Sequence, residues 1–306
     1  MWKVTPATLG TTCKQLKQKE WSERFVPELP EVETVRKGLD ELVTGETVDS
    51  VEVRWANIIA EPASNQFSKR LMGQTLEKVG RRGKFLLFYF PDDVVISHLR
   101  MEGKYELIEP DANGQIARRG KHTHVIFHLK SGKKLNYLDV RKFGRMYLVP
   151  RGEEFEHKSL VKLGPEPTVE DFILEKMQEF LTTRWKAIKG LLLDQEIVVG
   201  VGNIYADEIL FEAGIHPVTP ADRLTETEEI RMHQAIIDIL DAAVKNGGTT
   251  IRSYANAFGD AGTNQDNLKV YGKEGEACVN CGTEIDKIKV AGRGTHYCPV
   301  CQPMKE

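Results

Sequence analysis

The spacing of hydrophobic and polar positions changes along this 306-residue chain. Between residues 31 and 42, Val32, Val35 and Leu39 recur at the three- to four-residue spacing of an amphipathic helix. Short segments rich in β-branched and aromatic residues follow, separated by Gly, Asp, Asn or Pro, and these predict strands. The predicted strands cover residues 47–53, 84–90, 94–99, 124–129 and 134–138. Several short strands at this spacing predict a β-sandwich or barrel that ends near Pro150.

A helical pattern begins after residue 150. From about Val169 to Val244 the apolar positions predict helices, with breaks at 200–203 and 214–217. From about residue 270 the chain is rich in glycine and bears cysteine. We therefore predict an α+β multidomain fold. Its parts are an N-terminal extension (1–26), a β-sandwich with a helix at its start (27–150), a helical domain (151–269) and a cysteine-bearing hairpin (270–306).

Four of the five cysteines form two pairs near the C-terminus. Each pair is spaced C-x2-C and sixteen residues separate the pairs: Cys278, Cys281, Cys298 and Cys301. Four thiolates at this spacing predict a tetrahedral structural zinc site, one Zn²⁺ per chain, with no open position for catalysis. An iron–sulfur or redox site is the alternative. Between the pairs, residues 288–290 predict a strand, 291–294 a turn and 295–297 a return strand.

The net charge argues mildly against a nucleic-acid partner. The whole chain is formally -3 at pH 7; residues 1–26 carry five Lys or Arg and two Glu, so 37 basic and 43 acidic residues remain without them. Such a chain needs local basic clusters to hold DNA. Candidate clusters are Arg81, Arg82 and Lys84; Arg118, Arg119 and Lys121; Arg141, Lys142 and Arg145; and Arg184, Lys186 and Lys189. Taken alone, each of them is more often an ordinary solvated face than a DNA-binding site. No run of 18 apolar residues occurs, so we expect no membrane span.

The decapeptide from Pro27 to Arg36, Pro-Glu-Leu-Pro-Glu-Val-Glu-Thr-Val-Arg, sets a proline and a carboxylate directly ahead of the first predicted helix. A free N-terminal proline carries a secondary amine, which can attack an aldehyde-like carbon and form an iminium. Inside a longer chain the same nitrogen belongs to an amide and lacks this reactivity. Any covalent chemistry therefore depends on whether Pro27 begins the mature protein.

This decapeptide resembles the start of the formamidopyrimidine-DNA glycosylases, and the resemblance continues nearly to the C-terminus. In that family the proline is exposed when the initiator methionine is removed. Residues 1–26 contradict this, but they show no secretion signal and no helical or alternating pattern. Val26 stands where the initiator would be, and an internal GTG codon is translated as valine. We expect the extension to be an artefact of start assignment; a real extension removed by a protease is the alternative.

The resemblance implies a β-sandwich catalytic domain, a helix-two-turns-helix DNA-binding domain and a zinc finger. It implies a bifunctional glycosylase and AP lyase that removes oxidised purines, 8-oxoguanine and formamidopyrimidines, from duplex DNA. Pro27 would attack C1′ of the deoxyribose to form the Schiff base, Glu28 would shuttle protons, and Lys84 would serve β-elimination. Arg293, in Gly-Arg-Gly-Thr-His-Tyr-Cys-Pro, would contact phosphate and assist δ-elimination.

The resemblance also assigns DNA contacts. Met101, Arg141 and Phe143 would fill the gap left by the flipped nucleotide and so offset the cost of unstacking. Asn203 begins Asn-Ile-Tyr-Ala-Asp-Glu, where a helix N-terminus can bind phosphate, although an Asn cap without a ligand is the plainer explanation. The remaining predicted DNA contacts are His122, Lys189 and Ser253, the last in a lesion-covering loop between Thr249 and Gly272.

Two alternatives stay open. The related endonuclease VIII group shares the proline and the zinc hairpin but prefers oxidised pyrimidines and typically begins Pro-Glu-Gly-Pro; Leu29 favours the purine branch. If residues 1–26 stay attached, the chain is a lesion-binding protein without covalent chemistry. We expect damaged double-stranded DNA as the partner, no membrane, a monomer, and a location in the bacterial cytoplasm.

Overall fold

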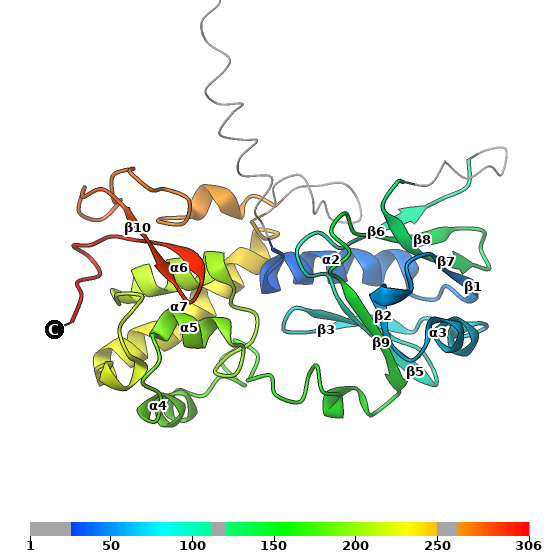
Figure 1. Ribbon diagram of the computed structural model, residues 1–306, viewed down its shortest axis with the longest axis horizontal. Coiled ribbons are helices and arrows are strands. Elements are labelled where there is room, and N and C mark those ends of the chain that lie inside the picture. The colour runs from blue at the N-terminus through cyan, green and yellow to red at the C-terminus, as the bar shows by residue number, and fades with distance from the viewer. Residues whose placement is uncertain (1–25, 112–119, 250–261, 306) are drawn as a thin grey trace, which may run out of the picture.

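The computed structural model describes residues 26–111, 120–249 and 262–305. The extension before Val26, the predicted basic residues Arg118 and Arg119, and Ser253 lie outside the described residues. Two bodies with separate hydrophobic cores stand side by side, and residues 151–173 connect them (Figure 1). None of the helices in the described ranges is long and apolar enough to cross a membrane.

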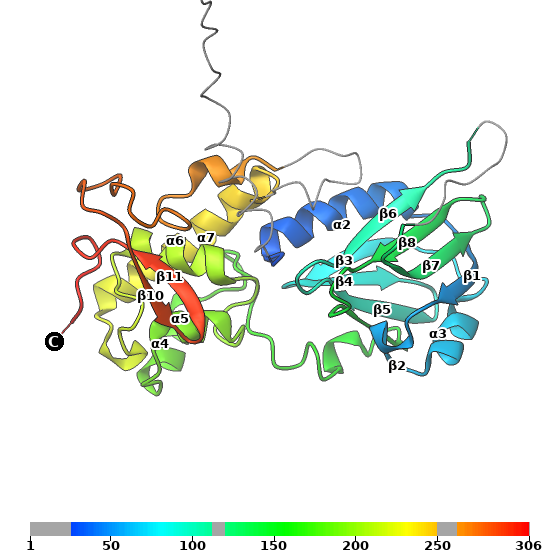
Figure 2. The same cartoon turned by 45° about the horizontal axis from the view of Figure 1, so that its top comes forward.

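The N-terminal body is a β-sandwich, which confirms the predicted architecture. One sheet has the order β1 (Val48–Val53), β7 (Thr123–Leu129), β8 (Lys134–Leu138) and β6 (Lys104–Ile108). The other has the order β2 (Ile59–Glu61), β9 (Arg145–Pro150), β5 (Asp93–His98), β4 (Phe85–Tyr89) and β3 (Lys78–Arg82). Figure 2 shows the two sheets face to face, with α3 (Ser64–Leu71) at one end. All pairs are antiparallel except β2 with β9.

The five strands predicted from the sequence are all present, within one or two residues at their ends. The prediction missed β2, β3, β6 and β9 together with α3. Three of these strands are edge strands, which have a neighbour on one side only and therefore carry many exposed polar residues. The β3 segment, Lys-Val-Gly-Arg-Arg, buries only Val79. Such strands show too weak a hydrophobic pattern to be recognised alone.

The predicted N-terminal helix is α2 (Leu29–Val43), and Val32, Val35 and Leu39 face the sandwich core as expected. The start of α2 reaches out of the sandwich and contacts α7 (Glu226–Lys245) of the second body. The beginning of this helix therefore lies between the two bodies (Figure 1).

The second body is helical and contains α4 (Leu174–Thr182), α5 (Ile188–Leu193), α6 (Asn203–Ala213) and α7. The break predicted at residues 214–217 follows from Gly214, which ends α6 in the left-handed conformation at φ 69°. A further break, at residues 183–187, was not expected. There the chain leaves α4 through a turn at Thr183, and Ala187 forms a bridge with Pro220.

The C-terminal hairpin consists of β10 (Asp286–Val290) and β11 (Arg293–Tyr297). Its turn is only Ala291 and Gly292, with φ of 49° and 76°, and Val290 pairs with Arg293. Arg293 therefore begins the return strand, whereas the sequence placed it inside a four-residue turn. The hairpin packs on α6. The domain boundaries at residues 150 and 269 stay predictions.

Candidate active site and nucleic-acid interface

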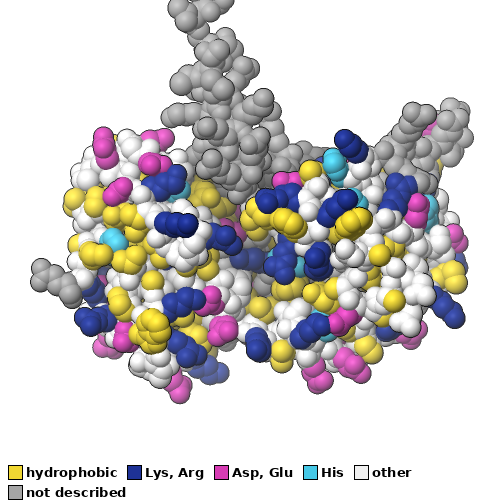
Figure 3. Space-filling model, in the orientation of Figure 1, with side chains coloured by type: hydrophobic (Ala, Val, Ile, Leu, Met, Phe, Trp, Pro, Cys, Tyr) yellow, Lys and Arg dark blue, Asp and Glu magenta, His cyan; other side chains and the backbone are white. Residues whose placement is uncertain are grey.

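A cleft of about 1100 Å³ opens between the sandwich, the helical body and the hairpin. The basic side chains that line it come from all three: Lys84, Arg100, Arg145, Lys186 and Arg293. Figure 3 shows Lys and Arg side chains gathered around the hollow between the two bodies. A chain with net negative charge thus concentrates positive charge in one place, as binding of a polyanion requires.

Glu28 joins the two bodies at the floor of this cleft. Its side chain is only 2% exposed, and its carboxylate accepts hydrogen bonds from the backbone N–H groups of Gly202 at 2.6 Å and Ile204 at 2.8 Å. These N–H groups belong to the first turn of α6, where unpaired donors and the helix dipole favour an anion. The second residue of the Pro27 decapeptide is therefore held by a helix that lies about 175 residues further along the chain.

The pKa of Glu28 is raised to about 7 because burial disfavours the charged carboxylate. The positive charge of Lys84 and the N–H donors of α6 oppose this shift, while the neighbouring Glu31 adds to it. An acid with a pKa near neutrality can both hold and release a proton under physiological conditions. This is the property expected of the proton shuttle predicted at Glu28.

Pro27 is buried directly before Glu28. In the 306-residue chain its nitrogen is bonded to Val26, whose side chain is 37% exposed and lines the cleft. The peptide that would become the N-terminus on loss of Val26 therefore lies at the wall of the cleft.

Glu31, one turn into α2, ties the start of this helix to the helical body. One carboxylate oxygen accepts the N–H of Glu28 at 2.8 Å. The other accepts the hydroxyl of Tyr205 at 2.9 Å and the N–H of Thr249 at 2.6 Å. Asn264 also donates to Thr249 Oγ1 at 3.2 Å, so this buried polar cluster holds both ends of the segment between residues 249 and 264.

Lys84 lies in the two-residue β3–β4 turn and points across the interface, where its Nζ donates to the carbonyl of Val201 at 2.8 Å. Burial lowers the pKa of Lys84, against the attraction of Glu28 and Glu31, and the charge of Arg293 lowers it further. A lysine with a lowered pKa exchanges protons more readily near neutral pH. The structure thus brings Lys84, Glu28 and Arg293 together around one space.

Arg81 and Arg82 do not share this position, although the sequence grouped them with Lys84. Arg81 forms ion pairs with Glu33 at 2.9 Å and with Glu166 at 2.7 Å, and Arg82 pairs with Glu166 at 2.9 Å. The basic cluster predicted there is therefore mostly an internal salt-bridge network that fixes the turn containing Lys84.

The predicted gap-filling residues lie on two loops of the sandwich. Met101 and Phe143 line the cleft, and the Phe143 ring is 46% exposed. The Arg141 guanidinium stacks on this ring at 4.8 Å. Neither Arg141 nor His122 is among the residues that line the cleft; His122 is half-buried, and its carbonyl accepts the N–H of Asp139.

The structure corrects the predicted cap of α6 and the predicted DNA contact of Lys189, whereas the DNA contact of Asn203, which lines the cleft, stays a prediction. Gly202, not Asn203, caps α6, and the Asn203 amide donates to the carbonyl of Gly294 at 3.1 Å. The anion at this helix N-terminus is the Glu28 carboxylate, so those N–H groups are not free for phosphate. Lys189 is fully buried in an ion pair with Asp207 at 2.6 Å and serves the interior rather than the DNA surface.

The four predicted metal ligands converge at the base of the hairpin. Their sulfur atoms all lie within 4.8 Å of one another, with Cys278 and Cys301 3.9 Å apart and Cys281 and Cys298 3.4 Å apart. Tetrahedral zinc with Zn–S bonds of about 2.3 Å requires sulfur atoms about 3.8 Å apart. The sulfur positions therefore fit a four-thiolate metal site, and when bound the metal would fix the loops that carry the hairpin.

The sequence did not single out Tyr205, Asp207 or Glu208, which the fold uses heavily. All three lie within α6 and are buried. Glu208 accepts N–H groups of residues 269–271 at 2.7 to 2.9 Å. The only signal was the pair of adjacent acids in a largely apolar helix, because buried charges need partners.

Family models match three segments of the chain. They are described as the formamidopyrimidine-DNA glycosylase N-terminal domain (residues 26–146), the formamidopyrimidine-DNA glycosylase H2TH domain (163–255) and a zinc finger found in FPG and IleRS (275–303). The zinc-finger match spans all four converging cysteines, which form the ligand set of one structural zinc ion.

Curated relatives match over nearly their whole length. A formamidopyrimidine-DNA glycosylase of Enterococcus faecalis is 56% identical over 280 residues, which cover 92% of this chain and 98% of that protein. The Bacillus subtilis protein of the same name is 50% identical over 284 residues, which cover 92% of this chain and all of that protein.

Solved structures of Lactococcus lactis Fpg agree with these matches. One with DNA containing an abasic site has a TM-score of 0.84 at 45% identity, and one with DNA containing Fapy-dG has 0.84 at 44%; each covers 90% of this chain and all of the other. The chain belongs to the formamidopyrimidine-DNA glycosylase family.

Proposed function

We propose that this protein is a bifunctional DNA glycosylase and AP lyase that excises 8-oxoguanine and formamidopyrimidines from duplex DNA. The observation that carries the proposal is the meeting of Glu28, Lys84 and Arg293 with the peptide of Pro27 at the wall of one basic cleft. The named relatives and the DNA in the Lactococcus lactis structures support the same lesion class.

In the proposed reaction the secondary amine of a free Pro27 attacks C1′ of the damaged nucleotide. The new C–N bond replaces the glycosidic bond, whose electron pair leaves with the base together with a proton. Transfer of a proton from Glu28 to the sugar ring oxygen opens the ring and gives the iminium; the pKa of Glu28, raised to about 7 by burial, suits this step. Loss of a C2′ proton then expels the 3′ phosphate, and a second elimination expels the 5′ phosphate. Hydrolysis frees Pro27.

The proposal requires a chain that starts at Pro27. Two observations support that start: the N-terminal family model first matches at residue 26, and the Bacillus subtilis protein is covered over its entire length by 92% of this chain. We propose that Val26 corresponds to a GTG initiator, read as methionine and then removed. The protein would act as a monomer in the bacterial cytoplasm, beside the chromosome.

The test compares two chains: one starting Met-Pro27, from which the initiator is removed, and the full 306-residue chain. Duplex DNA with one 8-oxoguanine is added with borohydride, which reduces the iminium to a stable protein–DNA bond. We expect trapping and strand cleavage with the first chain only. A Pro27→Ala variant of the short chain is the matched control. Two outcomes would contradict Pro27 as the nucleophile. In one, borohydride traps the full chain with Met1 intact on the DNA; in the other, it traps neither chain. DNA binding without trapping by both would favour a lesion-binding protein.

A second candidate substrate is an oxidised pyrimidine. One of the Lactococcus lactis structures contains DNA with an oxidised pyrimidine, at 44% identity and a TM-score of 0.84. Single-turnover rates on duplexes that differ only in the lesion, 8-oxoguanine or an oxidised thymine, separate the two. We expect faster excision of the purine; the reverse order would assign the endonuclease VIII-like preference.

A further inference from the structure

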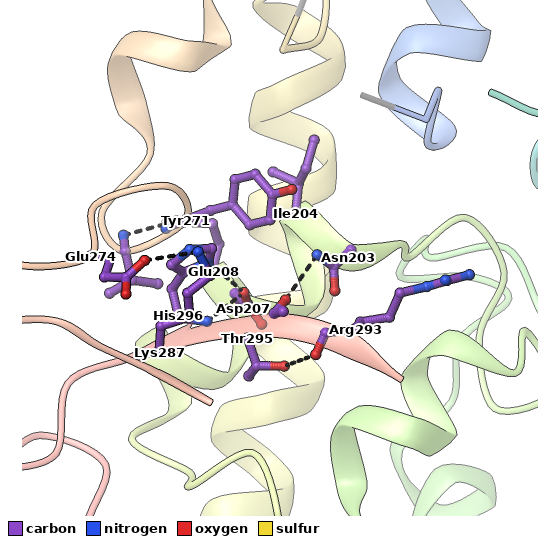
Figure 4. Close-up of polar contacts among 12 residues, drawn as sticks. Asn203, Ile204, Asp207, Glu208, Tyr271, Glu274, Lys287, Arg293, Thr295 and His296 are labelled. Atoms are coloured by element: carbon purple, nitrogen blue, oxygen red, sulfur yellow. Dashed lines mark hydrogen bonds and ion pairs between the residues drawn. The ribbon is translucent and has the colours of Figure 1, made fainter. Parts of the chain in front are cut away.

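A buried ion pair lies behind the hairpin that carries Arg293. The side chains of Lys189 on α5 and Asp207 on α6 are both 0% exposed, and Lys189 Nζ lies 2.6 Å from Asp207 Oδ1. The other oxygen, Oδ2, accepts the backbone N–H of His296 on β11 at 2.9 Å (Figure 4). One carboxylate thus links both helices to the hairpin.

Further polar contacts act on the same short stretch. Lys189 Nζ donates to Thr295 Oγ1 at 2.7 Å and lies 3.3 Å from the carbonyl of Gly294. The Asn203 amide donates to the same carbonyl at 3.1 Å. The three residues that follow Arg293 in the chain are therefore all held by side chains of α5 and α6, while the Arg293 side chain extends toward the cleft (Figure 4).

The metal site cannot supply this restraint. Its ligand Cys298 follows the end of β11, so Arg293 lies five residues away, about 17 Å along an extended strand. An isolated two-stranded hairpin is only marginally stable in water. Zinc fixes the base of the hairpin, and the polar contacts fix its far end.

We propose that Asp207 is a positioning residue for Arg293: together with Lys189 it sets the direction in which the arginine enters the cleft. The inference rests on the proposed function, since it assigns how the arginine of that site is aimed. Buried ion pairs add little net stability compared with apolar replacements, but they can specify one geometry. This role explains why two charged side chains are buried inside the helical body directly behind the strand that carries Arg293.

The test uses two variants of the chain that starts at Pro27. Asp207→Asn keeps the shape and an acceptor for His296 but removes the charge opposite Lys189. Lys189→Met with Asp207→Leu removes both charges and so avoids an unpaired buried charge. The matched control is Glu274→Gln, which breaks an exposed ion pair to Lys287 on the other strand of the same hairpin, 2.8 Å long (Figure 4).

The measured quantities are the ratio of δ- to β-elimination products on abasic-site duplex DNA, the affinity for that DNA, and the zinc content. We expect the ratio and the affinity to fall about tenfold in both variants, with one zinc per chain retained and the control unchanged. Arg293→Ala should cause a similar fall, and adding Asp207→Asn to it should cause no further change, because both act through one side chain.

A wild-type ratio in both Asp207 variants, or additive losses with Arg293→Ala, would overturn the proposal. Loss of zinc or of folding in both variants would also overturn it and assign the pair to stability. Wild-type protein without any elimination product would instead refute the proposed function. In that case the DNA affinities of the same variants would still test whether Asp207 positions Arg293.

Discussion

Glu28 shows how a single residue serves structure and chemistry together. Its carboxylate accepts hydrogen bonds from backbone N–H groups at the start of α6 that have no partner within the helix. Its burial raises its pKa to about 7. The two effects oppose each other: N–H donors favour the ionised form, whereas removal from water favours the neutral form, and the second is larger. The raised pKa therefore lets the carboxyl group hold a proton closer to neutral pH than an ordinary glutamate does, while its position is fixed.

This shift predicts a pH-dependent stability. Because the folded pKa lies above the ordinary value of 4.5, the folded state binds the proton more tightly, so this contribution is complete below pH 4.5 and is lost as the pH rises through 7. A shift from 4.5 to about 7 corresponds to about 3 kcal/mol. We expect urea midpoints of the wild type, relative to Glu28→Gln, to fall between pH 5 and pH 8. Parallel pH profiles of the two proteins would contradict the assignment.

At the scale of the element, the start of α6 is shaped to receive that carboxylate. A Cβ atom on Gly202 would lie 2.3 Å from the Glu28 carboxyl carbon, although the backbone there, at φ -120°, is open to any residue. Two residues earlier, Gly200 has φ 91° and faces Leu29. The absence of side chains at these positions lets the helix N-terminus and the Pro27 decapeptide touch.

Gly202→Ala should therefore displace the Glu28 carboxylate. Because a misplacement of about 1 Å can cost about a hundredfold in rate, we expect single-turnover excision to fall by about that factor. Gly73→Ala is the control: its methyl group would meet nothing within 4 Å, and only its φ of 85° is strained. Circular dichroism should show both variants folded. Wild-type excision by Gly202→Ala would show that the carboxylate need not stay at α6.

At the scale of the whole molecule, the basic side chains matter through their position in the cleft and not through the net charge. The chain is formally -3, yet three structural parts each place basic side chains at one cleft. Attraction to DNA therefore depends on this local concentration, and each phosphate contacted releases condensed counterions.

We expect steep salt dependence despite the negative net charge. About five phosphate contacts correspond to a slope of about -4.5 in a plot of log Kobs against log salt concentration. Lys186→Gln, in the cleft wall, should make the slope shallower by about one. Lys245→Gln, on the exposed side of α7 and 73% exposed, should leave it unchanged. Binding isotherms from 50 to 300 mM salt check this. Equal slopes for the wild type and Lys186→Gln would place the DNA elsewhere.

The sequence by itself determined the features that depend on neighbours in the chain. The periodicity of residues 31–42, the five predicted strands and the paired cysteines each carry their signal within a few residues, because helix turns, strand alternation and metal-ligand spacing are local. The Pro27 decapeptide likewise identified the family. Edge strands such as β3 escaped because one exposed face leaves little hydrophobic pattern.

Only the tertiary structure decided which charged groups are free. Arg81 and Lys189 look like DNA-binding residues in the chain, yet Glu33, Glu166 and Asp207 neutralise them from distant segments. The occupant of the α6 N-terminus also comes from far away in the sequence. The physical reason is that burial and long-range pairing set the cost and the availability of a charge, and both depend on segments that meet only after folding.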